Sequence, residues 1–162
     1  MLDLDLLNYF TQPLNSVDES LIKNTLFALS NIAVDSEKAA EAILNHEALI
    51  WRILTLMTNS LESLRKEATY ALTYAIMTSS EGCLREFHKS YMREYIKPLL
   101  ICLDYFQKNT DSKFVLEMLL TVKRLLEMDS KNPIYDTRLG PGYGSFRSYF
   151  TELGGEEIIE RV

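Results

Sequence analysis

Histidine and cysteine are the residues most suited to metal binding, and the sequence contains only two of each. His46 and His88 belong to different segments, and neither has a second ligand-type residue at the spacing that metal sites use. Cys83 and Cys102 form no CxxC pair, which argues against a zinc site and against a disulfide framework. We therefore predict no metal site, and we expect both thiols to be reduced and buried in two separate helices.

The sequence contains no GxSxG, GKS/T or HExxH motif. The glycine-rich segment Gly140–Ser145 has the composition of a phosphate-binding loop, but it follows a predicted helix rather than a strand and lacks the lysine. A flexible loop is the better interpretation of this segment. The sequence thus predicts no catalytic residue, no enzymatic activity and no cofactor.

Two groups of polar and aromatic side chains recur at the spacing of one helical turn. The first group is Asn24, Phe27 and Asn31, and the second is Glu67, Tyr70 and Tyr74. The second group is rotated by roughly 100° from an apolar face on the same segment. That apolar face consists of Leu64, Ala68, Ala71, Leu72 and Ala75. We predict that the apolar face packs in a core and that the aromatic stripe lies on a surface.

The two stripes lie in two copies of one sequence pattern, Leu21–Ile32 and Leu64–Ala75. Placing Phe27 over Tyr70 also aligns Lys23 with Lys66, at an offset of about 43 residues, which is the period of armadillo and HEAT units. A weaker third copy covers residues 114–128. Shorter apolar segments precede and separate the long ones; they are Leu2–Leu14, Ser36–His46, Ala48–Thr58, Glu81–Glu94 and Tyr95–Gln107.

The order of short, medium and long segments predicts an all-α fold, an armadillo-type right-handed α-solenoid of about three to four repeats. We expect armadillo repeats over residues 1–129, an irregular inserted loop over 130–145 and a partial terminal armadillo repeat over 146–162. In such a solenoid the stripes stack along a concave surface that binds extended chains. Within the loop, Tyr135, Arg138 and Tyr143 are candidates for a docking arm.

Local signals predict where the helices begin. Ser16 and Glu19 have the spacing of a capping box, which would open the first long helix. Asn59-Ser60 and the segment 109–111 supply N-cap candidates for the other two long helices. Pro98 falls near the first turn of its predicted helix, where its missing N–H costs little.

These residues resemble the C-terminal armadillo repeats of the importin-alpha family, whose long helices read roughly KEAxWAxSNxxxG. The segment Phe27–Asn31 (FALSN) is similar, with Phe in place of Trp, and Leu64–Leu72 (LRKEATYAL) is similar over its first half. The tail Tyr149–Ile159 (YFTELGGEEII) looks like the family's last repeat, which reads roughly YxxxIEEAGGLDKIE. The resemblance covers about residues 18–162.

The resemblance implies a function in binding basic nuclear-localisation peptides, as a nuclear transport adaptor. In that family the Asn amide bonds the peptide backbone, Trp rings hold Lys and Arg stems, and acidic groups meet their charges. Carried over by position, the peptide-binding candidates are Phe27, Ser30, Asn31, Glu67 and Tyr70. Tyr74 stands where the second Asn is expected and Asn24 where an acid is expected, so this groove is degenerate.

Two simpler interpretations of the stripe residues stay open. Phe27, Tyr70 and Tyr74 can pack inside the solenoid or against a partner protein, without forming slots for a peptide. Glu67 can be a solvated acid that pairs with neighbouring basic residues. We therefore expect a non-enzymatic protein-binding scaffold, a structural or adaptor subunit of a larger assembly, with a functional transport adaptor as the alternative.

Charge and composition limit the partners and the compartment. A formal net charge of −6 without a basic stretch argues against nucleic acid and favours basic partners, although mild acidity also serves solubility alone. No stretch approaches the ~20 apolar residues of a membrane span, and the acidic segment Met1–Asp5 is unlike a signal peptide. We expect the cytoplasm or nucleus, or an organellar assembly.

Both ends of the chain lack the polar caps that solenoids need. The N-terminal helix is expected to expose an apolar patch that a partner covers. This patch consists of Leu2, Leu4, Leu6, Leu7, Tyr9 and Phe10. The sequence is therefore interpreted either as a fragment of a longer protein or as a shortened relative docked in an assembly.

Overall fold

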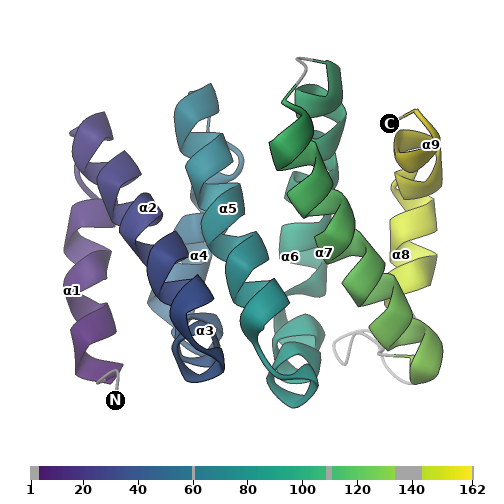
Figure 1. Ribbon diagram of the computed structural model, residues 1–162, viewed down its shortest axis with the longest axis horizontal. Helices are drawn as coiled ribbons and strands as arrows, with labels where there is room; N and C mark the ends of the chain where they lie inside the picture. Colours follow the sequence, from purple (N-terminus) through teal and green to yellow (C-terminus); the bar gives the residue numbers. More distant parts are fainter. Residues whose placement is uncertain (1–3, 60, 109–110, 134–143, 162) are drawn as a thin grey trace. The chain divides into compact units, whose positions relative to one another are not determined.

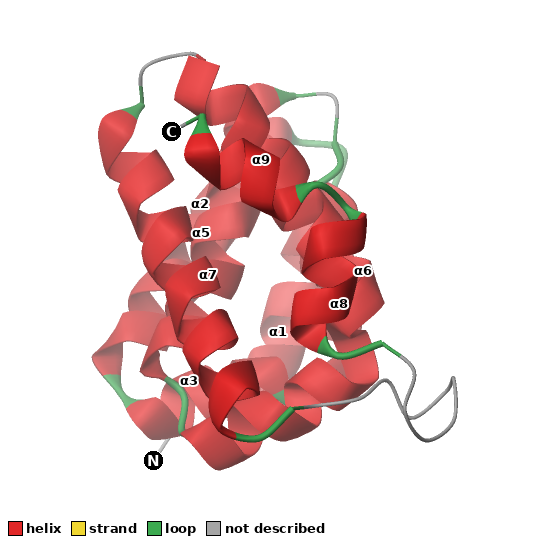
Figure 2. Ribbon diagram, turned by 90° about the vertical axis from the view of Figure 1, so that its right-hand side faces the viewer, coloured by secondary structure: helices red, strands yellow, loops and turns green. Residues whose placement is uncertain are grey.

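The structure is a computed structural model that describes residues 4–59, 61–108, 111–133 and 144–161. The elements within these ranges are all helices, joined by short connections, and none is a strand (Figure 2). The helices are α1 (Leu4–Leu14), α2 (Glu19–Asp35), α3 (Glu37–Leu44), α4 (Glu47–Leu56), α5 (Glu62–Thr78), α6 (Glu81–Lys108), α7 (Ser112–Lys131), α8 (Phe146–Glu152) and α9 (Gly155–Glu160). The predicted all-α class is thus confirmed.

The chain divides into two compact units, Met1–Leu84 and Arg85–Val162. In the first unit the long helices α2 and α5 lie side by side and run in the same direction (Figure 1). Helix α1 packs on α2 and α4, while α3 packs on both α2 and α5. The apolar face predicted on α5 is fully or almost fully buried, as are Leu26 and Leu29 of α2. The two predicted sequence copies are therefore neighbours in space.

The helix starts differ in part from the predicted caps. Asp18, not Ser16, is the N-cap of α2, because its carboxylate accepts hydrogen bonds from the Ser20 and Leu21 N–H groups, at 2.9 and 3.2 Å. The Ser16 hydroxyl instead accepts a hydrogen bond from the Asp18 N–H, one residue before the Glu19 N–H that a capping box requires. Leu61 occupies the N-cap position of α5 without a side-chain bond. Asp111 caps α7, within the predicted segment.

The second unit is built around α6 and α7. The Phe106 and Phe114 rings meet edge to face at 4.7 Å between centroids and join these two helices. Arg85 at the start of the unit donates to two carbonyl groups near the end of α7, those of Met128 and Asn132. The rings of His88 and Phe146 pack together with their centroids 5.2 Å apart, so α8, which begins at Phe146, covers the same core.

Helix α6 corrects the prediction that two helices cover residues 81–94 and 95–107. It is one helix of 28 residues with Pro98 in its interior. Pro98 removes a backbone hydrogen bond, at a cost of about 3 kcal/mol in a helix interior. A buried, mostly apolar stripe crosses the predicted break without losing helical phase and offsets that cost. The stripe consists of Leu84, His88, Met92, Tyr95, Leu99, Leu103 and Phe106.

Continuity of α6 also places both cysteines on one helix rather than on separate helices. Cys102 is buried and Cys83 is half-buried, and neither forms a disulfide. Burial raises the pKa of the Cys83 thiol, and the nearby Glu41 carboxylate raises it further. The thiol is therefore kept in its protonated form.

The candidates for a docking arm, Tyr135, Arg138 and Tyr143, lie outside the described residues.

Among the helices that the structure describes, none combines the length and the apolar character needed to cross a bilayer. This agrees with the predicted absence of a membrane-spanning segment.

Candidate functional site

The predicted stripe on α2 lies on the surface of the first unit. Phe27 is 58% exposed, and Asn24 and Asn31 on the same side of the helix are also exposed. Val34, seven residues after Phe27, continues the exposed apolar stripe by two turns. Sequence reasoning missed Val34, although its spacing from Phe27 is a detectable signal. The buried face of α2 fixes the orientation of this stripe.

The predicted stripe on α5 is half-buried. The Tyr70 and Tyr74 rings stack with centroids 5.5 Å apart and an angle of 20° between their planes. This pairing is an i, i+4 contact along one helix, which orders both rings before any partner arrives. Glu67 precedes them on the same side and is also half-buried.

Helices α2 and α5 pack directly on each other, and a charge interaction links them near the two stripes. Burial raises the pKa of the Glu67 carboxyl, while the positive charges of Lys23 and Lys66 oppose that rise. Lys23 belongs to α2 and Lys66 to α5, so Glu67 lies at the junction of the two helices. We call Asn24, Phe27, Asn31, Glu67, Tyr70 and Tyr74, on these two neighbouring helices, the α2–α5 face.

Ser30 does not belong to that surface. It is buried, and its hydroxyl donates a hydrogen bond of 3.0 Å to the Leu26 carbonyl one turn earlier. Serine and threonine in helix interiors often satisfy their hydroxyl this way, and Thr69 of α5 does the same with Arg65. Ser30 thus supports α2 from within the core rather than facing a ligand.

An apolar groove of about 360 Å³ runs between α1 and α2 beside the α2–α5 face. It is lined by Leu6, Tyr9, Phe10 and Pro13 of α1, and Asn24 also lines it from α2. Tyr9 is 76% exposed, whereas Leu7 on the opposite side of α1 is fully buried. The predicted apolar patch on the N-terminal helix is thus divided between the core and this groove. The side chains of Leu2 and Leu4 lie outside the described residues.

The histidines have structural partners. His46 is the N-cap of α4: its Nδ1 accepts from the Leu49 N–H, and its Nε2 lies 3.0 Å from Asn8 Oδ1. His88 is fully buried, with Nδ1 in hydrogen-bond contact with the Tyr95 hydroxyl. Burial lowers the pKa of His88 to about 3, and the charge of Arg85 adds to this effect. Among the described residues, no group of three potential ligands could hold a metal ion.

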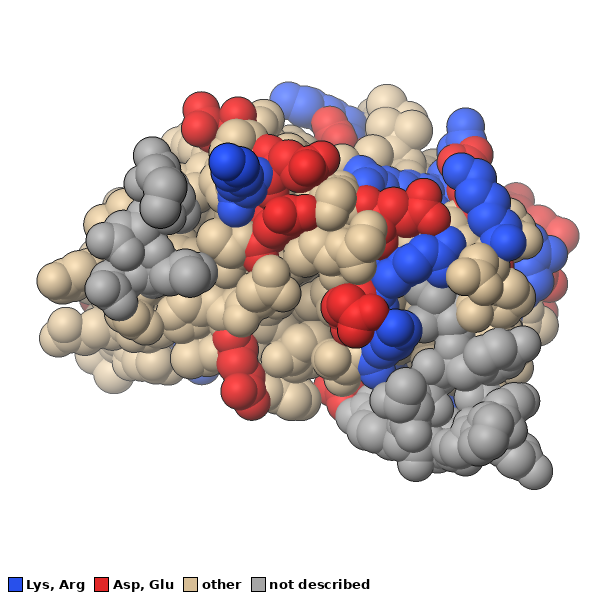
Figure 3. Space-filling view, turned by 90° about the horizontal axis from the view of Figure 1, so that it is seen from below, with Lys and Arg blue, Asp and Glu red and all other residues tan. Residues whose placement is uncertain are grey.

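Charged side chains of both signs share the surface shown in Figure 3. Lysine and arginine side chains there are interspersed with aspartate and glutamate rather than forming one continuous basic area. No family model matches the sequence, and a search of curated proteins finds no significant match. The resemblance to importin-alpha therefore stays a prediction that rests on the residues quoted above.

Proposed function

We propose that this chain is a non-enzymatic protein-binding subunit of a larger assembly, built as an armadillo-type solenoid. The α2–α5 face contacts a segment of another polypeptide, and the neighbouring α1–α2 groove takes apolar side chains of the same partner. The observation that carries this proposal is the exposure of Phe27 on α2, next to the helix α5 that carries the stacked tyrosine pair. Burying an aromatic ring of this size is a large favourable term in association.

The arrangement of apolar side chains supports a protein partner. Exposed apolar residues are ordinary when they are scattered, but a contiguous patch marks an interaction site. Here Leu6 and Tyr9 of α1 line a groove together with Asn24 of α2, and α2 also exposes Phe27 and Val34. The stacked tyrosine pair lies half-buried on the neighbouring helix α5.

The surroundings of Glu67 favour this proposal over a transport adaptor for basic peptides. In such an adaptor the carboxylate must receive the charge of an incoming lysine or arginine. Glu67 already interacts with Lys23 and Lys66, and both would repel that charge. The exposed amide of Asn31 is the one feature that favours the adaptor, because it can bond a peptide backbone.

Co-purification of the tagged chain at endogenous expression level tests the proposal. We expect the wild-type chain to bring down defined proteins in a fixed ratio, measured by quantitative mass spectrometry. Phe27→Asp should reduce that recovery about tenfold or more, since it places a charge in the centre of an apolar interface. Val17→Asp makes the same change at a fully exposed position before α2 and should leave recovery unchanged.

Equal recovery with Phe27→Asp and wild type would refute the role of the α2–α5 face. The adaptor alternative has its own signature. It requires salt-dependent binding of a Lys/Arg-rich peptide that Asn31→Ala and Glu67→Ala both abolish. We expect no such binding to the wild-type chain.

A further inference from the structure

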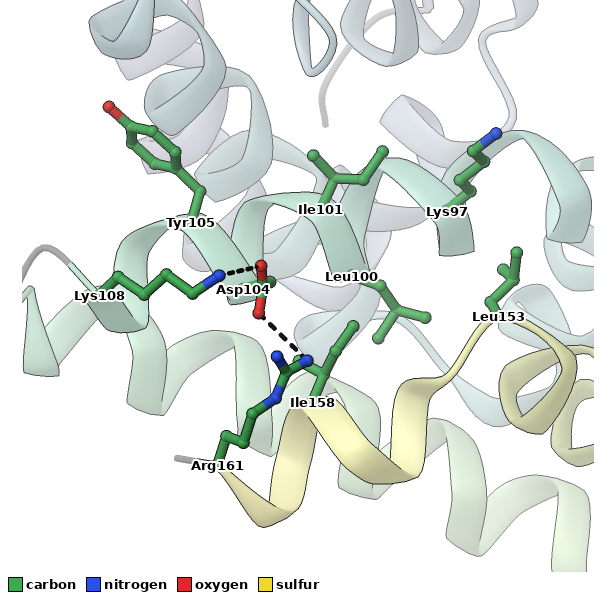
Figure 4. Close-up of a pocket in the computed structure, with 9 residues that line it drawn as sticks. All are labelled: Lys97, Leu100, Ile101, Asp104, Tyr105, Lys108, Leu153, Ile158 and Arg161. Carbon is green, nitrogen blue, oxygen red and sulfur yellow. Dashed lines mark hydrogen bonds and ion pairs between the residues drawn. The ribbon is translucent and has the colours of Figure 1, made fainter.

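A second groove lies in the second unit, within Arg85–Val162 (Figure 4). Its volume is about 530 Å³. One wall is a single stripe of α6, made of Lys97, Leu100, Ile101, Asp104, Tyr105 and Lys108. Leu153, Ile158 and Arg161 form the opposite wall, from the α8–α9 turn and from α9 with its C-cap.

The middle of this groove is apolar and open to solvent. Ile101 is 52% exposed, and Tyr105 beside it is also exposed. In Figure 4 the side chains of Leu100 and Ile158 point into the space between the two walls. The lining residues recur at helical spacing over three turns of α6, so Leu100, Ile101 and Tyr105 form an apolar strip that contains one carboxylate, Asp104, and has a lysine at each end.

The ends of the groove are positively charged. At one end the Asp104 carboxylate joins Lys108 and Arg161, at 2.6 and 3.3 Å. The hydrogen bond from Lys108 and the charges of both cations lower the pKa of Asp104, so the carboxylate stays ionised and holds them in place. Lys97 at the other end is exposed and pairs with no carboxylate among the described residues. Three cations therefore face one carboxylate.

We propose that this groove binds an amphipathic helix of a partner protein that carries two carboxylates three turns apart, on either side of an apolar strip. Lys97 and Lys108 are separated by eleven residues, or about 16 Å along the helix axis. A single carboxylate cannot reach both ends, whereas acidic residues at i and i+11 of a second helix match the spacing. Leucine-type residues between them meet Leu100 and Ile101.

This inference is independent of the α2–α5 face. That face belongs to the first unit, and there Lys23 and Lys66 act on the single carboxylate of Glu67. In the groove of the second unit, the lysines lie at the two ends of an apolar strip. The two surfaces therefore select partners by different chemistry. An assembly subunit with both would contact two different segments.

A synthetic helix tests the inference on the full chain. The probe is a fluorescent, alanine-based peptide of about 18 residues, long enough to be partly helical in water. It carries two glutamates eleven residues apart with leucines in the two intervening turns. We expect saturable binding that weakens with added salt, as for exposed charge pairs. Lys97→Glu should weaken binding about tenfold, and Ile101→Asp should weaken it at least as much.

Matched variants locate the binding. Lys113→Glu makes the same charge reversal in the first turn of α7, outside the groove, and should bind as wild type does. A probe with lysine in place of the glutamate that meets Lys97 should regain affinity for the Lys97→Glu variant. Phe27→Asp should have no effect, which separates this site from the α2–α5 face.

Three results would overturn the inference. The wild-type chain could fail to bind the probe at any concentration up to millimolar. Binding could be equal in wild type, Lys97→Glu and Ile101→Asp, although circular dichroism shows that both variants are folded. Decanoate could displace the probe completely at its own saturating concentration, which would make the groove a site for small amphiphilic anions.

Discussion

Replacing Leu72 with alanine is expected to lower the free energy of unfolding by about 2–5 kcal/mol, the range for leucine deletions in a packed core. Leu72 lies on the buried face of α5 and has no exposed surface. The fluorescence of Trp51, the single tryptophan, reports on the same unit during urea unfolding. The urea concentration at which half of the protein is unfolded should fall, while the slope of the unfolding free energy against urea concentration stays the same.

Leu21→Ala is the matched control for this prediction. Leu21 is 42% exposed on α2, so the same change removes little buried surface and creates no cavity. We expect a loss below about 1 kcal/mol. An equal loss for both substitutions would mean that the α5 face is not a tightly packed core.

Acidification is expected to destabilise the protein through His88. The pKa of this imidazole is about 3 in the folded chain and about 6.5 when exposed. Between these values the unfolded chain binds a proton that the folded chain does not, so stability is complete above pH 6.5 and falls as the pH falls. Each pH unit below 6.5 costs about 1.4 kcal/mol, or about 2 kcal/mol at pH 5. Urea unfolding at pH 7, 6 and 5 measures this slope.

Substitution separates His88 from the other titrating groups. His88→Gln removes the titration and should flatten the dependence on pH between 7 and 5, even if it lowers stability at pH 7. His46→Gln removes the only other histidine, an N-cap residue, and should keep the slope of the wild type. A slope that survives in His88→Gln but disappears in His46→Gln would contradict the burial of His88.

The first unit could be predicted well from the sequence because its signals are local and repeated. The alignment of Phe27 with Tyr70 implied that their helices are equivalent, and α2 and α5 do pack side by side. The apolar spacing on α5 identified its buried face correctly. Helix starts were less predictable, because Ser16, Asp18 and Asn59 all accept backbone hydrogen bonds near a helix start, although only Asp18 is an N-cap.

Helix α6 could not be divided correctly from the repeat pattern. The armadillo arrangement calls for a break before Tyr95, and Pro98 supported it by local propensity. The buried stripe from Leu84 to Phe106 continues through both positions, and tertiary packing outweighed the local signal. Following the apolar phase across the segment would have revealed the single helix.

The candidate site was predictable in its positions but not in its environment. Exposure of Phe27 and Asn31 follows from helical phase alone. The burial of Ser30 and the interaction of Glu67 with Lys23 depend on how α2 packs against its neighbours, which only the packed structure shows. The groove along α6 also brings together residues more than 50 positions apart, such as Asp104 and Arg161.

Site-specific cross-linking tests most directly whether the α2–α5 face contacts another polypeptide. A photo-reactive phenylalanine replaces Phe27 in one sample and Val17 in another, and the tagged chains are irradiated in cells. We predict that position 27 yields a discrete cross-linked protein that co-purifies in fixed ratio, while position 17 yields none. The same yield at both positions, or cross-links only within this chain at position 27, would contradict the proposed function.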